Sequence, residues 1–224
     1  RMKNKTTDYK SDTVVKKYFK RTLASVFINY PAVLKAAGDI KGKTVLDFGC
    51  GAGCLSKELH KKGAKVFAID NSPKWIDICR MENNHSPNMK FILSDGSNLN
   101  IFPAKKFDVA IANMVFLSVA SPRKLTKMFG AISRVMKKGG VFIFSDCHPF
   151  AAVVGKTSTK VSPPLRDFCY FDDGVTYKAT YLLCDYSSIE FSDSHWSMGF
   201  YSRLLKKHGF MIEEVIEPKP FKMD

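Results

Sequence analysis

The sequence of 224 residues lacks any apolar run that approaches the roughly 20 residues of a membrane-spanning helix. Residues 1–21 are polar and basic, without the apolar core of a secretory signal. None of the six cysteines belongs to a Cys-x-x-Cys pair, so neither a zinc cluster nor a thioredoxin-type site is indicated. These absences predict a cytoplasmic protein with free thiols, no membrane span and no bound metal.

Arginine is scarce although the sequence is strongly basic, with 7 Arg against 28 Lys and a net charge of +14. Lysine is a hydrated point charge, whereas specific recognition of phosphates and bases favours arginine forks. The basic residues are also spread along the chain. We therefore expect a solvated basic surface, and contact with nucleic acid is the less favoured alternative.

Strands and helices are predicted to alternate from residue 44 onward, in a chain without internal repeats. The predicted strands are apolar runs, at residues 44–48, 65–69, 91–93, 107–112 and 141–145. The predicted helices between them are residues 55–62, 73–82 and 122–137, the last capped by Ser121. This alternation predicts an α/β fold with a doubly wound, mostly parallel sheet and helices on both faces.

The sharpest motif is Val-Leu-Asp-Phe-Gly-Cys-Gly-Ala-Gly at residues 45–53, between the first strand and the next helix. Glycines let the backbone turn tightly and approach a ligand closely. The second strand ends at Asp70, where a carboxylate can accept both ribose hydroxyls of an adenosine. The motif therefore predicts a nucleotide-type site at the carboxyl ends of the strands.

Two kinds of cofactor compete for this turn. A dinucleotide brings a diphosphate to the helix N-terminus, whereas S-adenosylmethionine brings an aminoacyl sulfonium without phosphate. Asp47 lies two residues before the first glycine, where a carboxylate repels a diphosphate and stabilises a cation. The spacing is also Gly-x-Gly-x-Gly rather than Gly-x-Gly-x-x-Gly, and both features favour S-adenosylmethionine.

The motif resembles motif I of the class I S-adenosylmethionine-dependent methyltransferases. The resemblance extends through Ser94-Asp95-Gly96, Phe107-Asp108-Val109 and residues 135–140, where Lys138 replaces the usual proline. It implies a Rossmann-like fold, S-adenosyl-L-methionine as cofactor and S-adenosyl-L-homocysteine as product. The implied cofactor-binding residues are Asp47, Gly49, Cys50, Gly51, Asp70, Asn71, Asp95, Gly96, Asn113 and Met114.

The rest of the chain is expected to complete the sheet and to cover the site. Residues 1–40 are predicted as a helical segment over the cofactor site, and residues 41–224 as the methyltransferase domain. Residues 149–178 show no periodicity and are interpreted as a lid over the acceptor. Strands at 180–186 and 211–216, around a helix at 196–207 with Ser194 as its cap, would bring the sheet to seven strands.

A narrower resemblance concerns the acceptor. A His-Pro-Phe after the fifth strand and a histidine before the last helix are similar to a subgroup of small-molecule methyltransferases. His148 and His195 are therefore the candidate catalytic bases, because histidine titrates near neutral pH. A loop role for His148 and a packing role for His195 remain alternatives. Tyr170, Phe171 and Trp196 are candidates for lining the acceptor, with core packing as the alternative.

Three functions follow from these patterns. The preferred one is a methyltransferase acting on an unidentified small molecule. The basic surface leaves methylation of RNA or protein as a second hypothesis. The third hypothesis is a Rossmann domain of another class, either an NAD(P)-dependent oxidoreductase or a binding module without catalysis.

Overall fold

The computed structural model describes residues 7, 11, 22, 24–82, 86–150, 160–161 and 169–219. Of the helical segment predicted over residues 1–40, residues 1–6, 8–10, 12–21 and 23 lie outside this part. Of the predicted lid, residues 151–159 and 162–168 lie outside it. None of the described helices combines the length and apolar character needed to cross a membrane. The six cysteines are free, as expected.

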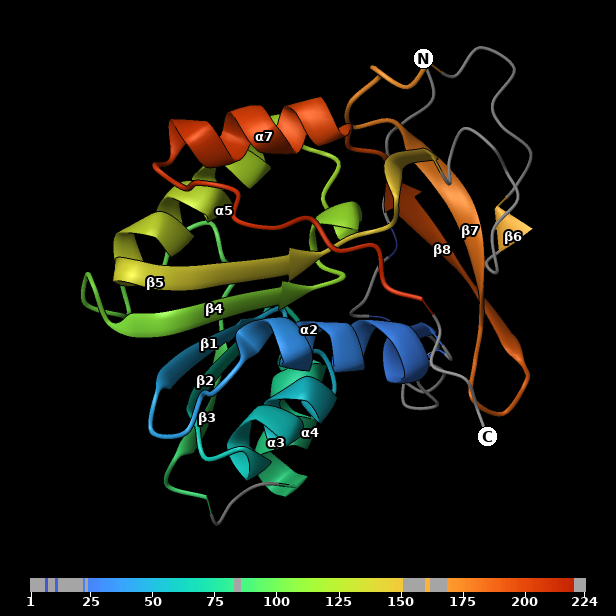
Figure 1. Ribbon diagram of the computed structural model, residues 1–224. Coiled ribbons are helices and arrows are strands. Elements are labelled where there is room, and N and C mark those ends of the chain that lie inside the picture. Colours follow the sequence, from blue (N-terminus) through green and yellow to red (C-terminus); the bar gives the residue numbers. More distant parts are fainter. Residues whose placement is uncertain are drawn as a thin grey trace.

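Five parallel strands form the central sheet, in the order β3-β2-β1-β4-β5 (Figure 1). The strands are β1 (Thr44–Phe48), β2 (Lys65–Asp70), β3 (Met89–Leu93), β4 (Phe107–Asn113) and β5 (Met136–Ser145). The chain turns back from β3 to β4 on the other side of β1, so the order reverses beside β1. Ligands of open α/β sheets bind at such a switch point, outside the carboxyl ends of the strands.

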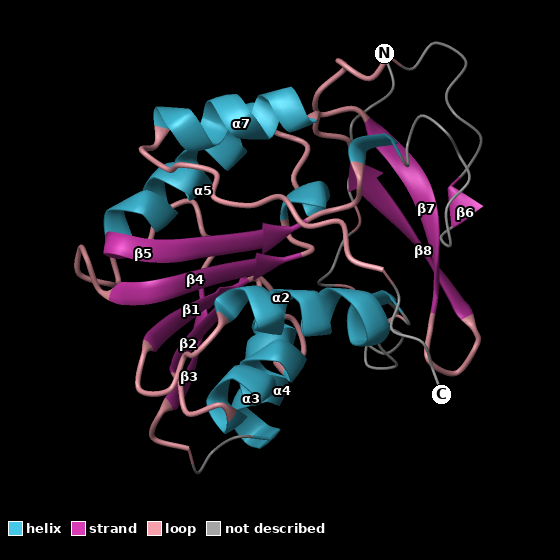
Figure 2. Cartoon of the chain, in the orientation of Figure 1, coloured by secondary structure: helices cyan, strands magenta, loops and turns pink. Residues whose placement is uncertain are grey.

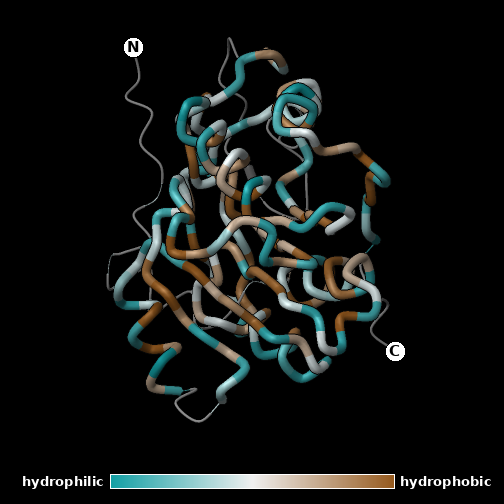
Figure 3. The backbone as a smooth tube through the Cα atoms, turned by 90° about the vertical axis from the view of Figure 1, so that its left-hand side faces the viewer, coloured by the Kyte–Doolittle hydropathy of each residue, from teal (hydrophilic) through white to brown (hydrophobic). Residues whose placement is uncertain are grey.

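Helices cover both faces of the sheet, which confirms the predicted doubly wound fold (Figure 2). Successive strand residues point to opposite faces, so Val45 and Leu46 belong to different apolar clusters. The face of Val45 is covered by α2 (Tyr30–Ala37), α3 (Cys54–Lys61) and α4 (Pro73–Glu82). The face of Leu46 is covered by α5 (Pro122–Val135) and α7 (Met198–Lys207). Figure 3 shows hydrophobic segments of the chain running through the interior.

A second sheet replaces the two further strands that we expected in the first. β6 (Lys160–Val161), β7 (Thr176–Leu182) and β8 (Ser188–Ser194) pair antiparallel in the order β6-β7-β8. A short turn joins β7 to β8, and such a turn brings antiparallel partners together more readily than a crossover brings parallel ones. The prediction of seven strands in one sheet is therefore wrong for the described residues.

The strand predicted at residues 211–216 is also wrong. This segment has no regular secondary structure, no described strand pairs with it, and Met211 is 89% exposed. Its apolar residues favoured a strand, yet after α7 ends at Lys207 the chain packs beside β5 without pairing to it, with the Phe210 ring 5.3 Å from that of Phe142.

Two boundaries differ from those predicted. α5 begins at the expected cap, since Ser121 Oγ accepts a hydrogen bond from the Lys124 N–H at 3.3 Å. It ends at Val135, and β5 starts at once, so the glycines expected to separate them lie within the strand. The cap of α7 is Ser197, whose Oγ accepts from the Phe200 N–H at 3.1 Å, and not Ser194. Ser194 is instead buried at the end of β8.

Candidate functional site

A cavity of about 440 Å³ opens at the carboxyl ends of β1, β2, β3 and β4. Its volume lies in the range of small-molecule and cofactor sites. Most of the predicted cofactor residues line it: Gly49, Gly51, Asp70, Asn71, Asp95, Gly96, Asn113 and Met114. Asp47 and Cys50 lie beside it, on a second cavity of about 30 Å³ that shares Gly49, Gly51 and Asn113.

The backbone N–H groups of the glycine turn after β1 donate hydrogen bonds to other groups of the protein. The N–H groups of Gly49 and Cys50 donate to the Ile69 carbonyl at 2.8 and 2.9 Å. The Gly51 N–H donates to Asp70 Oδ2 at 2.9 Å, and the Gly53 N–H donates to the Cys50 carbonyl at 2.9 Å. A diphosphate site needs such donors free. The turn therefore does not offer them to a dinucleotide.

Carboxylates dominate the charge of the cavity wall. Asp70 closes β2, and its Oδ1 accepts a second backbone hydrogen bond, from Ser72, at 2.9 Å. Burial raises the pKa of Asp95, but hydrogen bonds from Ser97 and nearby lysine charges outweigh it, so that the pKa is lowered and the group is ionised at neutral pH. Among the described lining residues, Lys124 is the cation. These carboxylate oxygens are hydrogen-bond acceptors with negative charge. They suit a ligand with hydroxyl and amino donors and a positive charge, and S-adenosylmethionine is such a ligand.

Asp47 is held away from solvent, with 1% of its surface exposed. Its Oδ2 accepts a hydrogen bond of 2.5 Å from the Ser56 hydroxyl. Burial raises the pKa of Asp47 to about 7; the Ser56 hydrogen bond opposes this rise, and the Asp70 charge adds to it. The sequence predicted a carboxylate facing a cationic ligand; with its pKa raised to about 7, this group is not fully ionised at neutral pH. A bound cation would draw it toward the ionised form.

Asn113 and Met114 form the wall that follows β4. Asn113 Oδ1 accepts from the Ser145 hydroxyl at 2.7 Å, which ties the ends of β4 and β5 together. Met114 has a φ of 57°, an unusual value for a residue with a side chain, and its N–H donates to the Ser145 carbonyl at 3.0 Å. Met114 therefore lines the cavity in an unusual backbone conformation, and such conformations are common at ligand sites.

Several lining residues were not predicted. They come from the segment after β4 and from neighbouring helices: Val115, Ser118, Val119, Ala120, Ser121, Trp75 and Met128. Ser121 was identified only as a helix cap. The 3-10 turn η2 (Phe116–Ser118) brings this segment back over the cavity, and no sequence pattern indicated that path.

Position 96 requires a glycine because of its backbone conformation and because of the side chain packed against it. Its φ is 72°, and a Cβ on it would lie 2.2 Å from Cζ of the buried Phe48 ring. We expect Gly96→Ala to lower the free energy of unfolding by about 3 kcal/mol, combining overpacking with the backbone penalty. Gly42→Ala is the matched control, because Gly42 has a φ of 75° but nothing within 4 Å of its Cβ. If urea unfolding showed the same decrease in the free energy of unfolding for both variants, the steric part of this prediction would be contradicted.

The two candidate catalytic histidines do not line the described cavities. His148 is exposed, with Nε2 2.9 Å from Oε1 of Glu217 and Nδ1 accepting from the Phe150 N–H at 3.2 Å. His195 is buried, and its Nε2 lies 2.8 Å from the Tyr170 carbonyl oxygen. These contacts favour a packing role for His195, while the catalytic role of His148 stays a prediction.

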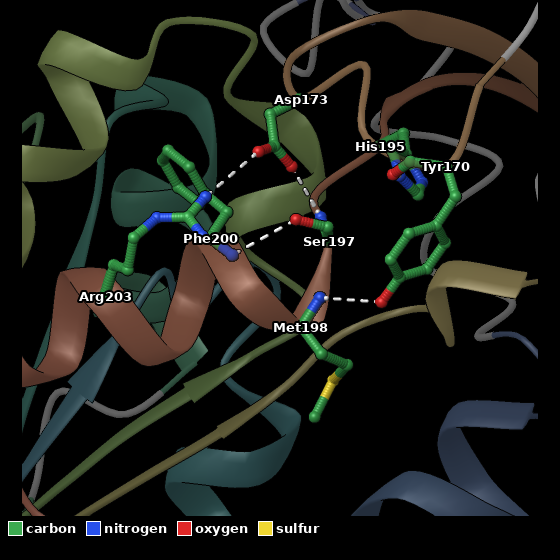
Figure 4. Close-up of polar contacts among 7 residues, drawn as sticks. All are labelled: Tyr170, Asp173, His195, Ser197, Met198, Phe200 and Arg203. Atoms are coloured by element: carbon green, nitrogen blue, oxygen red, sulfur yellow. Dashed lines mark hydrogen bonds and ion pairs between the residues drawn. The ribbon is translucent and has the colours of Figure 1, made fainter.

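The three candidate acceptor-lining residues are also separate from the described cavities. Figure 4 shows Tyr170 beside the start of α7, where its hydroxyl accepts from the Met198 N–H at 3.1 Å. Asp173 accepts from the Ser197 N–H at 2.7 Å, so the loop satisfies two N–H groups at this helix start. Trp196 packs in the core and donates to the Phe116 carbonyl at 3.2 Å. Phe171 is 77% exposed.

A five-stranded parallel sheet with a glycine turn after β1 and carboxylates at the next two strand ends defines the Rossmann-like fold of the methyltransferases. Residues 46–144 match the family model described as a methyltransferase domain. This match spans less than half of the chain; together with the fold, it supports a class I S-adenosylmethionine-dependent methyltransferase domain.

Two curated relatives and one solved structure illustrate the relationship. Thiol S-methyltransferase TMT1B of Rattus norvegicus is 33% identical over 47% of this chain and 45% of its own length. N-demethylindolmycin N-methyltransferase of Streptomyces griseus is 23% identical over 96% of this chain and 92% of its own. A solved structure of a candidate S-adenosylmethionine-dependent methyltransferase from Listeria monocytogenes has a TM-score of 0.65 and 26% identity, covering 86% and 85% of the two chains. The chain spans about half the length of the rat protein and of other curated relatives that it matches.

Proposed function

We propose that this protein transfers the methyl group of S-adenosylmethionine to a small-molecule acceptor. The observation that carries the proposal is the chemistry of the main cavity, where acidic oxygens replace the free N–H donors of a dinucleotide site. The relatives support a small acceptor, since the names of the rat and Streptomyces griseus proteins denote S-methylation of a thiol and N-methylation of N-demethylindolmycin. The atom that accepts the methyl group differs between them.

Different residues of the cavity would bind different parts of the cofactor. Asp70 would accept hydrogen bonds from the ribose hydroxyls, and Asp95 would meet the adenine amino group. Asp47 would stabilise the cationic aminoacyl end across the glycine turn. When bound, S-adenosylmethionine supplies an activated methyl group on a sulfonium. The protein would then contribute mainly orientation, which can lower a barrier by about 7–11 kcal/mol.

Apolar side chains would keep water from the reacting end. Phe48, Ile69, Trp75, Val115 and Met128 belong to the wall of the main cavity. The N-terminal segment and the loop at residues 149–178 are proposed to complete this cover. Thr7 lines the main cavity and Tyr30 lines the smaller one, which supports the part of this proposal that concerns residues 1–40.

Three titrations and one labelling assay test the function. Isothermal titration is expected to show micromolar or tighter binding of S-adenosylmethionine and S-adenosylhomocysteine, and none of NADP⁺. Incubation of the protein with methyl-labelled cofactor and a metabolite extract, followed by mass spectrometry, should reveal a labelled small molecule. Tight binding of NADP⁺ without binding of S-adenosylmethionine would refute the proposal.

A further inference from the structure

A second group of acidic and phenolic side chains lies beyond the end of β5, outside the described cavities. Asp146 follows β5, Tyr201 comes from α7, Tyr177 and Tyr181 from β7, and Asp193 from β8. We refer to these residues, together with Cys147, as the acidic cluster. It joins the parallel sheet to the antiparallel one.

Hydrogen bonds connect the members of the acidic cluster. Asp146 accepts from the Tyr201 hydroxyl and, at 2.7 Å, from the Cys147 N–H. Cys147 Sγ lies 3.1 Å from the Tyr181 hydroxyl, which donates to Asp193 Oδ2 at 2.5 Å. The two carboxylates therefore share one network.

One oxygen of this network has no described partner. Asp193 has 0% of its surface exposed, and its Oδ1 accepts no hydrogen bond among the described residues. A buried acceptor without a donor costs about 1–3 kcal/mol, and more when it is charged. Such an oxygen marks a place where a ligand donor would be stabilising.

The charge of the acidic cluster is also unbalanced. Within the described residues, no lysine, arginine or histidine forms an ion pair with Asp146 or Asp193. Burial is the main cause that raises the pKa of each of these two aspartates to about 7, and the charge of Asp193 adds to the rise at Asp146. The described residues also contain no group of three metal-ligating side chains, which favours an organic cation over a metal ion.

The acidic cluster adjoins the proposed cofactor cavity on two sides. Asp146 is the residue after Ser145, whose hydroxyl bonds to Asn113 of the cavity wall. On β8, the Ser192 N–H donates to the hydroxyl of Thr7 at 2.6 Å, and Thr7 lines the same cavity. Asp146, Cys147 and Tyr177 each keep part of their residue surface exposed, although the carboxyl group of Asp146 is itself buried, as is Asp193.

We propose that Asp193 and Asp146 bind a protonated amine carried by the methyl acceptor. An ammonium group would donate to the open Oδ1 of Asp193 and balance the charge of both carboxylates. The faces of the surrounding phenols would add cation–π attraction. This inference rests on the proposed function, and it narrows the acceptor to small molecules that carry an amine.

Thermal unfolding with ethylammonium chloride as the probe tests the binding site without any methyl transfer. At pH 8 and a concentration ten times its Kd, ethylammonium should raise the Tm by about 3 °C above the value in equimolar NaCl. Ethanol, the neutral isostere, should not. Asp193→Asn and Asp146→Asn should each abolish the shift, while Glu190→Gln, an exposed charge on the same strand, should retain it.

Two variants keep the test valid if one of them fails to fold. Absence of an ammonium-specific shift in the unmodified protein, or its persistence in both Asn variants, would show a structural network only and overturn the inference. Titration of S-adenosylmethionine on the same sample separates the two proposals. Cofactor binding without the ammonium effect refutes the amine site alone. The reverse result refutes the methyltransferase function, and with it the methyl acceptor as the source of the amine, but leaves the amine site itself standing.

Discussion

Replacing Asp70 by asparagine is expected to weaken S-adenosylmethionine binding about 100-fold, because two charge-assisted hydrogen bonds to the ribose would be lost or weakened. The same carboxylate also accepts the N–H groups of Gly51 and Ser72, at 2.9 Å each. An asparagine has one acceptor oxygen, so its amide group would face one of these donors. The glycine turn would lose part of its support as well.

Asp77→Asn is the matched control for this experiment. Asp77 lies on α4, the helix that follows Asp70, and it is exposed. It carries the same charge and lines neither cavity. Isothermal titration should give an unchanged Kd for the control variant. A Kd within threefold of the unmodified protein for Asp70→Asn would remove Asp70 from the cofactor site.

The stability of the ligand-free protein is expected to fall as the pH rises from about 4 to about 7, through the contribution of Asp47. In the unfolded chain this group loses its proton near pH 3.8, whereas burial holds its pKa near 7 in the folded chain. Between these values the folded state binds more protons, so the free energy of unfolding decreases with rising pH. Full ionisation above pH 7 would cost on the order of 4 kcal/mol.

Asp47→Asn should remove this contribution, whereas those of Asp146 and Asp193, whose pKa values burial also raises to about 7, should remain. The asparagine cannot ionise and its oxygen can still accept the Ser56 hydrogen bond, so the variant should be more stable than the unmodified protein at pH 8 and similar to it near pH 4.5. Urea unfolding at both pH values measures the difference, with Asp39→Asn as the control at an exposed turn. A variant that is equally destabilised at both pH values would show that the carboxylate is not protonated in the folded state.

Much of the cofactor site was predictable because its signals are local. The glycines at 49, 51 and 53 all have positive φ, which the chain needs in order to turn from β1 into α3. Asp70 and Asn113 follow apolar runs, and the carboxyl ends of parallel strands meet at one edge of a sheet. Local patterns predicted the turn and Asp70, the resemblance to methyltransferases implied residues such as Asp95 and Asn113, and together they placed eight of the ten predicted cofactor residues on the main cavity.

The region expected to bind the acceptor was harder to predict. Neither of the two candidate bases lines a described cavity, because His148 pairs with Glu217 and His195 bonds to a backbone carbonyl. The acidic cluster was not predicted at all. Its members are spread from residue 146 to residue 201, and they meet only because β7 and β8 form a separate antiparallel sheet beside the end of β5.

The sequence by itself determined the doubly wound sheet and the nucleotide-type turn, since hydrophobic periodicity and glycine spacing act within short stretches of chain. The tertiary structure alone decided which donors of that turn are already used, how deeply Asp47 is buried and which acids face one another near β5. Hydrogen bonding, desolvation and charge coupling depend on distances between residues far apart in the chain, and those distances exist only after folding.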